Sequence, residues 1–285
     1  AEVLKSDGYK TAAFAASFSV DSRFGLAQGF DLYDDNFQEN SPFKATNAER
    51  RAEQVFELFS TWMDANRDEP FFAWVHFFDP HAPYNPPSPY GEQFAGRPYD
   101  GEISYMDYVF GRVMAKLGDR GLLGRTIVVA AGDHGEGLGD KGEWGHGVFL
   151  YDETLRVPLI LSAPGHLPAG EMVGPRVRLI DIMPTVLDLL NRPAPEGTQG
   201  ASLVPYIQKK RKADLDVYIE THYPKENFGW APLTGLIAKS WKYIRAPKEE
   251  LYDIERDPAE TDNRIAAEGK TAREMRDGLD RTVMD

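Results

Sequence analysis

Short continuous runs of apolar residues alternate along this chain with longer segments in which apolar residues recur at helical spacing. Such runs predict strands, and they occupy residues 11–16, 71–78, 126–131 and 157–162. Helical spacing predicts helices at residues 48–66, 101–117 and 180–190. The run at 71–78 predicts a strand buried on both faces. Alternation of this kind predicts an α/β fold, in which a mostly parallel sheet carries helices on both faces.

The pattern changes after Pro193, where short strands separated by turns replace the longer elements. These strands are predicted at residues 216–221, 233–238, 241–245 and 250–254. Strands so short and so closely spaced favour a small antiparallel sheet, and we expect the charged tail from residue 259 to end in a helix. The sequence thus predicts a large α/β domain at residues 1–212 and a small α+β subdomain at residues 213–285.

The composition excludes several classes of function. The chain of 285 residues has 32 basic and 45 acidic side chains, hence a net charge of −13. A surface this acidic repels phosphate backbones, so nucleic acid is not an expected partner. The chain lacks cysteine, which excludes disulfides, thiolate zinc sites and cysteine nucleophiles. No run approaches the ~18 apolar residues of a membrane span. The sequence does not indicate an oligomeric state.

Two candidate metal ligands follow the predicted strand at 126–131. Asp133 and His134 come directly after this strand and stand among glycines. In open α/β sheets ligands bind at the carboxyl ends of the strands, and both side chains are metal-ligand types. An isolated Asp-His pair more often caps a turn, but this placement favours a metal site. Since a hard divalent cation takes about six ligands, other residues must complete the coordination.

Two further histidines are candidates for catalysis and for binding an anionic substrate. His81 lies in a loop stiffened by prolines after the run at 71–78, and such rigid placement suits anion recognition. His146 stands between two glycines, where an imidazole can donate to an ester oxygen or protonate a leaving group. The alternative for His146 is a flexible surface loop.

Other polar residues are interpreted as structural. His76 lies within the apolar run, which favours a core histidine. The pair Asp34 and Asp35 is rejected as a metal site because no strand is predicted to aim it, and Lys141 is expected to be solvated.

Several of these segments resemble one family. Gly132-Asp-His-Gly-Glu-Gly-Leu-Gly139 and the stretch from Gly145 to Ile160 are similar to the sulfatase branch of the alkaline-phosphatase superfamily. Supporting segments resemble the same family: His76-Phe-Phe-Asp-Pro-His-Ala-Pro-Tyr84, residues 179–188, Lys242-Tyr-Ile and residues 250–263. The resemblance covers nearly the whole chain.

The resemblance implies a metal-assisted hydrolysis of a sulfate ester, whose substrate is a small molecule or a glycan. Asp133 and His134 would ligate a divalent cation, usually Ca²⁺, with Mn²⁺ or Mg²⁺ as alternatives. His81 would contact the anionic ester, and His146 would take the place of a cationic Lys or His near the leaving group. Members are often exported, so the resemblance also implies an exported or periplasmic protein, although no residue here indicates a compartment.

One departure limits this expectation. The family's nucleophile is a formylglycine made from a Cys/Ser-x-Pro-x-Arg motif, and further Asp ligands lie near it; neither feature is found in residues 1–285. We therefore expect this chain to be the C-terminal portion of a longer enzyme and to be inactive alone. A phosphodiesterase, phosphonate hydrolase or phosphoethanolamine transferase of the same superfamily stays an alternative, as does a non-catalytic degenerate relative.

Overall fold

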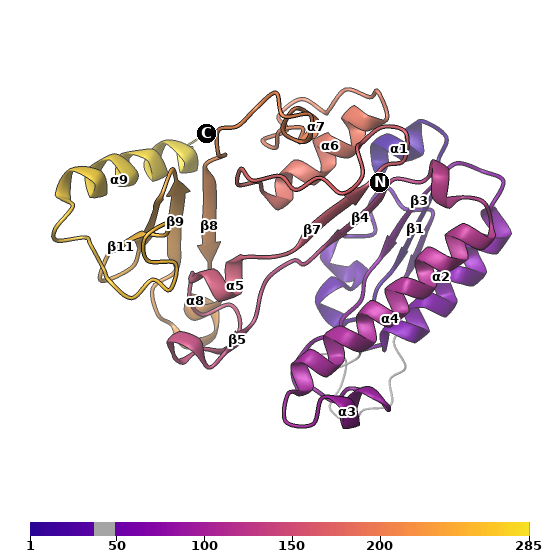
Figure 1. The fold of residues 1–285 in the computed structure, drawn as a ribbon, viewed down its shortest axis with the longest axis horizontal. Coiled ribbons are helices and arrows are strands. Elements are labelled where there is room, and N and C mark those ends of the chain that lie inside the picture. The colour runs from indigo at the N-terminus through magenta and orange to yellow at the C-terminus, as the bar shows by residue number, and fades with distance from the viewer. Residues whose placement is uncertain (37–48, 285) are drawn as a thin grey trace. The chain divides into compact units, whose positions relative to one another are not determined.

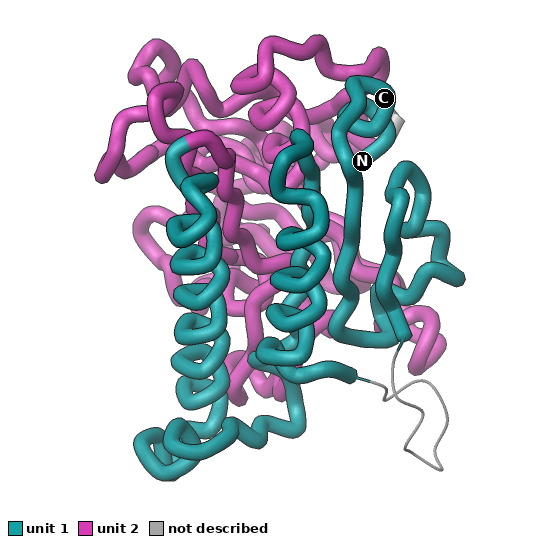
Figure 2. Tube along the Cα trace, turned by 90° about the vertical axis from the view of Figure 1, so that its right-hand side faces the viewer, with its two compact units in different colours: residues 1–124 teal, residues 125–285 magenta. Residues whose placement is uncertain are grey.

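The computed structural model describes residues 1–36 and 49–284. The chain forms two compact units, residues 1–124 and residues 125–285, which are coloured separately in Figure 2. Each unit is described by itself. The expected division at residues 212 and 213 lies within the second unit and stays a prediction. None of the helices in the described ranges is long and apolar enough to cross a membrane.

The first unit is built on a parallel sheet. Its strand order is β2 (Leu32–Asp34), β1 (Lys10–Phe14), β3 (Phe71–Val75), and both pairings are parallel. Helix α2 (Ala52–Asn66) lies along this sheet, as Figure 1 shows. The Phe14 ring meets Phe59 and Trp62 of α2 edge-on, with ring centroids 6.1 and 6.0 Å apart. The core of this unit therefore lies between β1 and α2.

A second long helix packs against α2. Helix α4 (Pro98–Asp119) packs against α2, and Arg112 of α4 forms ion pairs with Glu53 and Glu57 of α2. The remaining short elements are α1 (Glu2–Ser6), α3 (Tyr90–Gln93), η1 (Phe18–Val20) and η2 (Ser22–Phe24), and η3 (Leu123–Arg125) spans the boundary between the two units in the sequence.

Two predictions for this unit need correction. The run at 71–78 is a strand only to Val75, and β3 is half-buried because it is an edge strand; the buried strand is β1. Helix α2 begins at Ala52 rather than at residue 48, which lies outside the described residues. The Gln54 side chain accepts a hydrogen bond from the Arg51 N–H and so caps the helix there.

The second unit begins with a two-stranded sheet. Strand β4 (Val128–Ala131) pairs with β7 (Leu159–Ser162), and the pairing is antiparallel. The sequence predicted a continued parallel arrangement, which needs a crossover of a dozen or more residues, usually a helix. The intervening segment instead holds only short elements: β5 (Gly137–Leu138), η4 (Asp140–Gly142), β6 (Trp144–Gly145) and α5 (Asp152–Leu155). The chain can therefore return antiparallel to β4.

The rest of this unit confirms the predicted antiparallel sheet. Its strand order is β11 (Glu250–Asp253), β10 (Trp241–Arg245), β9 (Leu233–Ala238), β8 (Val217–Thr221), and all pairings are antiparallel. Helix α9 (Gly269–Met284) packs on this sheet, where Leu279 joins a buried cluster with Leu236 and Tyr243. The remaining helices are η5 (Leu179–Asp181), α6 (Ile182–Leu189), α7 (Val204–Ile207) and α8 (Tyr223–Phe228).

A second apolar cluster ties the loop after β6 to this sheet. Leu150 is 2% exposed and packs with Ile219, Ile237 and Ile244. The segment that carries His146 is therefore anchored a few residues later in the core of the second unit.

Candidate functional site

Asp133 and His134 lie at the carboxyl end of β4, as the sequence predicted. Both side chains are exposed. The turn that follows is fixed by two backbone hydrogen bonds, because Gly135 and Glu136 donate to the carbonyls of Thr154 and Glu153 at 2.9 Å. Position 135 must be glycine, since a Cβ there would lie 2.1 Å from the Glu153 carbonyl oxygen. The two candidate ligands thus stand on a turn clamped to α5.

The contacts of His134 set its tautomer. Its Nδ1 lies 2.9 Å from the Gly135 carbonyl oxygen, and since a carbonyl can only accept, Nδ1 carries the proton. The Nε2 lone pair is then available for a metal ion. Nε2 lies 3.7 Å from Oδ2 of Asp133. This separation is less than twice a typical metal–ligand distance of about 2.0–2.4 Å, so one ion can reach both atoms.

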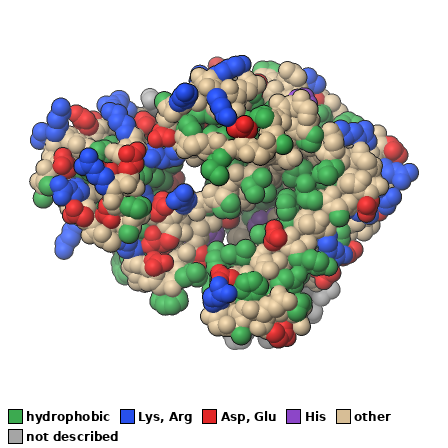
Figure 3. All heavy atoms as spheres, viewed as in Figure 1, with side chains coloured by type: hydrophobic (Ala, Val, Ile, Leu, Met, Phe, Trp, Pro, Cys, Tyr) green, Lys and Arg blue, Asp and Glu red, His purple; other side chains and the backbone are tan. Residues whose placement is uncertain are grey.

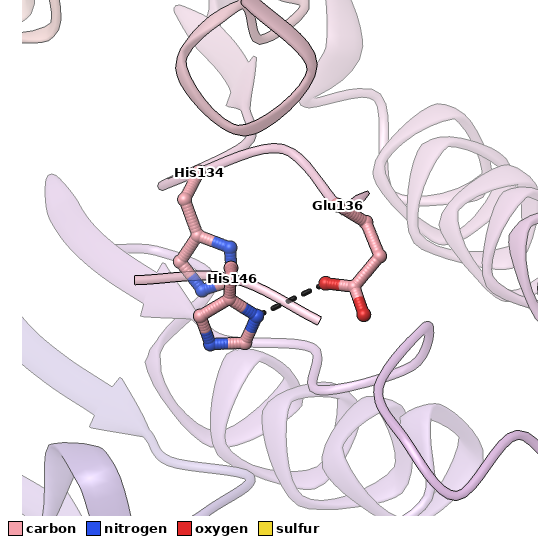
Figure 4. A group of neighbouring side chains, drawn as sticks. All are labelled: His134, Glu136 and His146. Carbon is pink, nitrogen blue, oxygen red and sulfur yellow. Dashed lines mark hydrogen bonds and ion pairs between the residues drawn. The ribbon is translucent and has the colours of Figure 1, made fainter. Parts of the chain in front are cut away.

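His146 lies beside His134, and Figure 4 shows the two rings with Glu136 next to them. The imidazole rings are stacked, with centroids 3.7 Å apart and an interplanar angle of 28°. His146 Nδ1 donates to Oε2 of Glu136 over 3.0 Å. Ligand atoms of His134, Glu136 and His146 all lie within 4.8 Å of one another, close enough to hold a metal ion together. The structure therefore brings together two predicted site residues and one that the sequence reasoning missed.

Glu136 is the missed residue, although it stands within the quoted motif. Its side chain is only 7% exposed. Burying a carboxylate is costly unless it has partners, so Glu136 needs a hydrogen-bonding partner. The signal in the sequence that could have indicated this residue is a Glu between two glycines, ten positions before the His of Gly-His-Gly. Its carboxylate fixes the orientation of the His146 ring.

The loop that carries His146 is held by a second buried carboxylate. Glu143 is 4% exposed and accepts hydrogen bonds from the backbone N–H groups of Val148 and Phe149, at 2.7 and 3.2 Å. Burial raises the pKa of Glu143 above its usual value, although these two hydrogen bonds oppose the shift. The Thr221 hydroxyl donates to the Gly147 carbonyl. His146 is thus on a fixed segment, which argues against the flexible surface loop considered from the sequence.

His81 belongs to the first unit, and buried carboxylates order its loop. Glu102 is 2% exposed and accepts from the backbone N–H groups of His81 and Asn85, at 3.1 and 2.8 Å. Arg51 bridges Glu102 to Asp79 with contacts of 3.2 and 2.7 Å. The His81 ring stacks on Phe78 with centroids 4.0 Å apart. Its Nδ1 donates to the Ala82 carbonyl over 2.7 Å, so the predicted rigid placement of His81 has a physical basis. Its catalytic role stays a prediction.

The remaining polar candidates are structural. His76 Nδ1 accepts a hydrogen bond from the Ala16 N–H over 3.1 Å, which agrees with a structural histidine. The premise for rejecting Asp34 was wrong, because Asp34 lies in strand β2; its carboxylate is nonetheless paired with Arg50 at 2.7 Å. Lys141 is exposed, as expected, although its Nζ also donates to the Glu260 carbonyl over 2.6 Å.

Basic and acidic side chains are mixed on the face around α9, as Figure 3 shows. Many are paired, for example Arg245 with Asp280 at 2.6 Å and Arg276 with Glu249 at 2.5 Å. This face therefore offers no continuous basic surface for a polyanion.

Comparison with known proteins decides the family. Residues 1–192 match the family described as Sulfatase, and residues 139–284 match the family described as N-sulphoglucosamine sulphohydrolase, C-terminal. The chain belongs to the sulfatase family. This confirms the resemblance drawn from residues 132–160, and it is consistent with the alkaline-phosphatase superfamily.

Curated relatives of this sulfatase-family chain are longer than the chain. The arylsulfatase of Clostridium perfringens is 26% identical over 246 residues, which cover 70% of this chain and 50% of that protein. The choline-sulfatase of Rhizobium meliloti is 34% identical over 172 residues, which cover 59% of this chain and 32% of that protein. The matched part thus spans half or less of these relatives.

Solved structures confirm the α/β fold. A putative sulfatase from Bacteroides fragilis matches with a TM-score of 0.82 at 21% identity, over 99% of this chain and 76% of its own. A protein solved with its substrate D-glucosamine-2-N,6-O-disulfate matches with a TM-score of 0.81 at 19% identity, over 99% and 80%. The phosphonate monoester hydrolase of Agrobacterium radiobacter matches with a TM-score of 0.79 at 19% identity, over 97% and 78%. At such identities the likeness concerns the fold alone.

Proposed function

We propose that the protein to which this chain belongs hydrolyses a sulfate ester with the help of a divalent cation. The observation that carries the proposal is the approach of Nε2 of His134 to Oδ2 of Asp133 at the end of β4, 3.7 Å apart, with Glu136 and His146 beside them. A scaffold protein needs no such convergence of ligand-type side chains, so this observation disfavours a degenerate, non-catalytic relative.

The donor set fits a divalent cation. Asp133 offers a carboxylate oxygen, and His134 offers Nε2 because its Nδ1 is protonated and bound to Gly135. The family resemblance favours Ca²⁺, whereas a nitrogen donor suits Mn²⁺ better than Ca²⁺, which prefers oxygen. When bound, the cation would supply positive charge to the oxygens of the sulfate group.

The protein side chains would do the rest of the work near the leaving group. His146 Nδ1 is bound to Glu136, which leaves Nε2 as the atom to face a substrate. When the ring carries a second proton, on Nε2, His146 would donate a hydrogen bond or that proton to the oxygen that leaves. The family resemblance assigns contact with the anionic ester to His81, whose loop is ordered by the network around Glu102. The nucleophile is not assigned to any residue of this chain. We therefore propose that residues 1–285 alone do not turn over a substrate.

The substrate class in this proposal is a small-molecule or glycan sulfate ester. It is supported by the family and by the sulfated sugar bound to one structural neighbour. A second candidate is hydrolysis of a phosphonate or phosphate ester, which is supported by the similar phosphonate monoester hydrolase.

Rate measurements on the complete parent protein test the proposal. We expect it to release sulfate from 4-nitrophenyl sulfate, to lose that activity when stripped of metal, and to regain it when Ca²⁺ or Mn²⁺ is added. His146→Ala should lower kcat by about 100-fold or more, while His166→Ala, a change at an exposed histidine outside the site, should leave it unchanged.

Three outcomes would contradict the proposal. Faster turnover of phenyl phosphonate than of the sulfate ester would favour the second candidate. Activity that changes neither on metal removal nor in Asp133→Ala would show that the reaction does not depend on a metal. Measurable sulfatase turnover by residues 1–285 alone would overturn the statement about the nucleophile.

A further inference from the structure

A cavity of about 300 Å³ lies in the unit formed by residues 125–285. Three segments supply its walls: the stretch after His146, the stretch after α8, and the turn between β10 and β11. Their wall residues are mainly apolar and include Val148, Phe149, Trp230, Leu233, Ile244 and Pro247. A pocket with this volume and lining falls at the lower end of the range for small-molecule sites, roughly 300–1,000 Å³.

An exposed aromatic cluster borders this cavity. Trp230, which lines it, is 60% exposed, and its ring centroid lies 5.0 Å from that of Phe228. Phe228 is 51% exposed and contacts Tyr223, with ring centroids 5.9 Å apart. Aromatic side chains of this size usually bury most of their area. A group of them left in solvent beside an apolar cavity is typical of a binding site.

The polar groups of the lining favour an apolar occupant. The Glu250 carboxylate already accepts hydrogen bonds from the hydroxyls of Tyr151 and Tyr252, at 3.0 and 2.9 Å. The other charged side chain among the described lining residues is Lys248, which is exposed. Each sugar hydroxyl buried here without a partner would cost about 1–3 kcal/mol, whereas apolar cavities of ~150 Å³ already bind benzene. An aromatic ring therefore suits this cavity better than a sugar ring.

The wall formed by Val148 and Phe149 follows closely in the chain on His146. Val148 is two residues from His146, so their Cα atoms are at most about 7 Å apart. Glu143 binds the backbone N–H groups of both Val148 and Phe149, which makes this wall and the His146 loop one fixed segment. On the other side, a Cβ on Gly147 would lie 3.5 Å from the Tyr223 ring, so the aromatic cluster packs against the same loop.

We propose that this cavity binds the aryl group of an aryl sulfate whose ester oxygen faces His146, with Trp230 as the main contact. The proposal rests on the proposed sulfatase function and adds the substrate class: an aryl sulfate rather than a glycan sulfate. In the net reaction, water supplies the oxygen that the released sulfate gains. The bond between sulfur and the phenolic oxygen breaks, and the phenol leaves with one of the protons of water.

Binding of p-cresol, which has no sulfate group, tests the cavity apart from catalysis. Saturation-transfer NMR on the complete protein should show p-cresol binding, and titration should give at least about fivefold weaker affinity for Trp230→Ala. Ala246→Leu fills the cavity from another wall and should also abolish or weaken binding. Tyr108→Ala, which removes an aromatic residue that is 54% exposed and outside the lining, should not change it.

The possible results separate the two proposals. Three results would overturn the aryl pocket. They are the absence of p-cresol binding, p-cresol binding by Trp230→Ala and Ala246→Leu that is as tight as that of the unmodified protein, and methyl glucoside binding that these variants weaken in the same way. If p-cresol binds as expected but the complete protein releases no sulfate from 4-methylphenyl sulfate, the sulfatase proposal fails while the pocket stands. If both hold, Trp230→Ala should raise KM for that ester about fivefold with little change in kcat.

Discussion

The buried pair of Lys242 and Glu260 gives the sharpest test of how the second unit is held together. Lys242 lies in β10, and its Nζ is 2.5 Å from Oε1 of Glu260; the two side chains are 0% and 1% exposed. Glu260 also accepts from the Asp152 N–H over 2.8 Å, and its carbonyl accepts from Lys141. This one residue thus connects the C-terminal sheet to both ends of the segment that carries His146.

Removal of one member should be costly because the other charge stays buried. Breaking a buried ion pair in this way typically costs about 3–5 kcal/mol. Glu260 keeps the hydrogen bond from Asp152 in Lys242→Met, so we expect the lower end, a loss of about 3 kcal/mol in the free energy of unfolding. The double variant Lys242→Met/Glu260→Gln leaves no buried charge and should lose less than about 1.5 kcal/mol.

Urea denaturation followed by circular dichroism measures these differences. Lys270→Met is the matched control, since Lys270 is 85% exposed and its pair with Glu274 spans 3.8 Å. It should change stability by less than about 0.5 kcal/mol. Two results would refute the expectation that the unpaired buried charge of Glu260 destabilises Lys242→Met. One is a loss of less than about 1 kcal/mol in the free energy of unfolding of that variant, and the other is a double variant as unstable as the single one.

Two further predictions concern the turn after β4 and the alkaline limit of stability. Gly135→Ala should lower the free energy of unfolding by at least about 2 kcal/mol, because its Cβ meets the Glu153 carbonyl. Gly111→Ala, in helix α4 with open space around it, should instead raise it by about 1 kcal/mol. Equal effects of the two changes in thermal denaturation would contradict this. Burial raises the pKa values of Tyr33 and Tyr218 to about 12, so the folded chain keeps protons that the unfolded chain releases above about pH 10. The free energy of unfolding should therefore fall as the pH rises from about 10 to 12, and Tyr218→Phe should reduce that slope; an unchanged slope would contradict the assignment.

The sequence was most informative where hydrophobic periodicity and turn residues agreed. Strands β9 and β10 lie at the predicted residues 233–238 and 241–245, because alternation between turn signals defines short antiparallel strands well. The orientation of β7 was not predictable in this way. Whether a strand returns parallel or antiparallel depends on how the intervening segment packs, and residues 132–158 contain only short elements that local patterns do not resolve.

For the site, the sequence identified ligand-type residues but not their partners. Asp133, His134 and His146 were visible from a strand end and a Gly-His-Gly, and the structure places the two histidine rings face to face. Glu136 was missed because its importance comes from burial and from its bond to His146, neither of which a linear pattern reveals. The role of Glu143 depends in the same way on backbone groups that fold back onto it.

The most direct test of the metal site formed by Asp133 and His134 is the anomalous difference map of a crystal of the complete protein soaked with Mn²⁺. We expect one strong peak within about 2.0–2.4 Å of both an Asp133 carboxylate oxygen and Nε2 of His134. A well-ordered site in which the ion binds other residues, while Asp133 and His134 bind only protein neighbours, would contradict it.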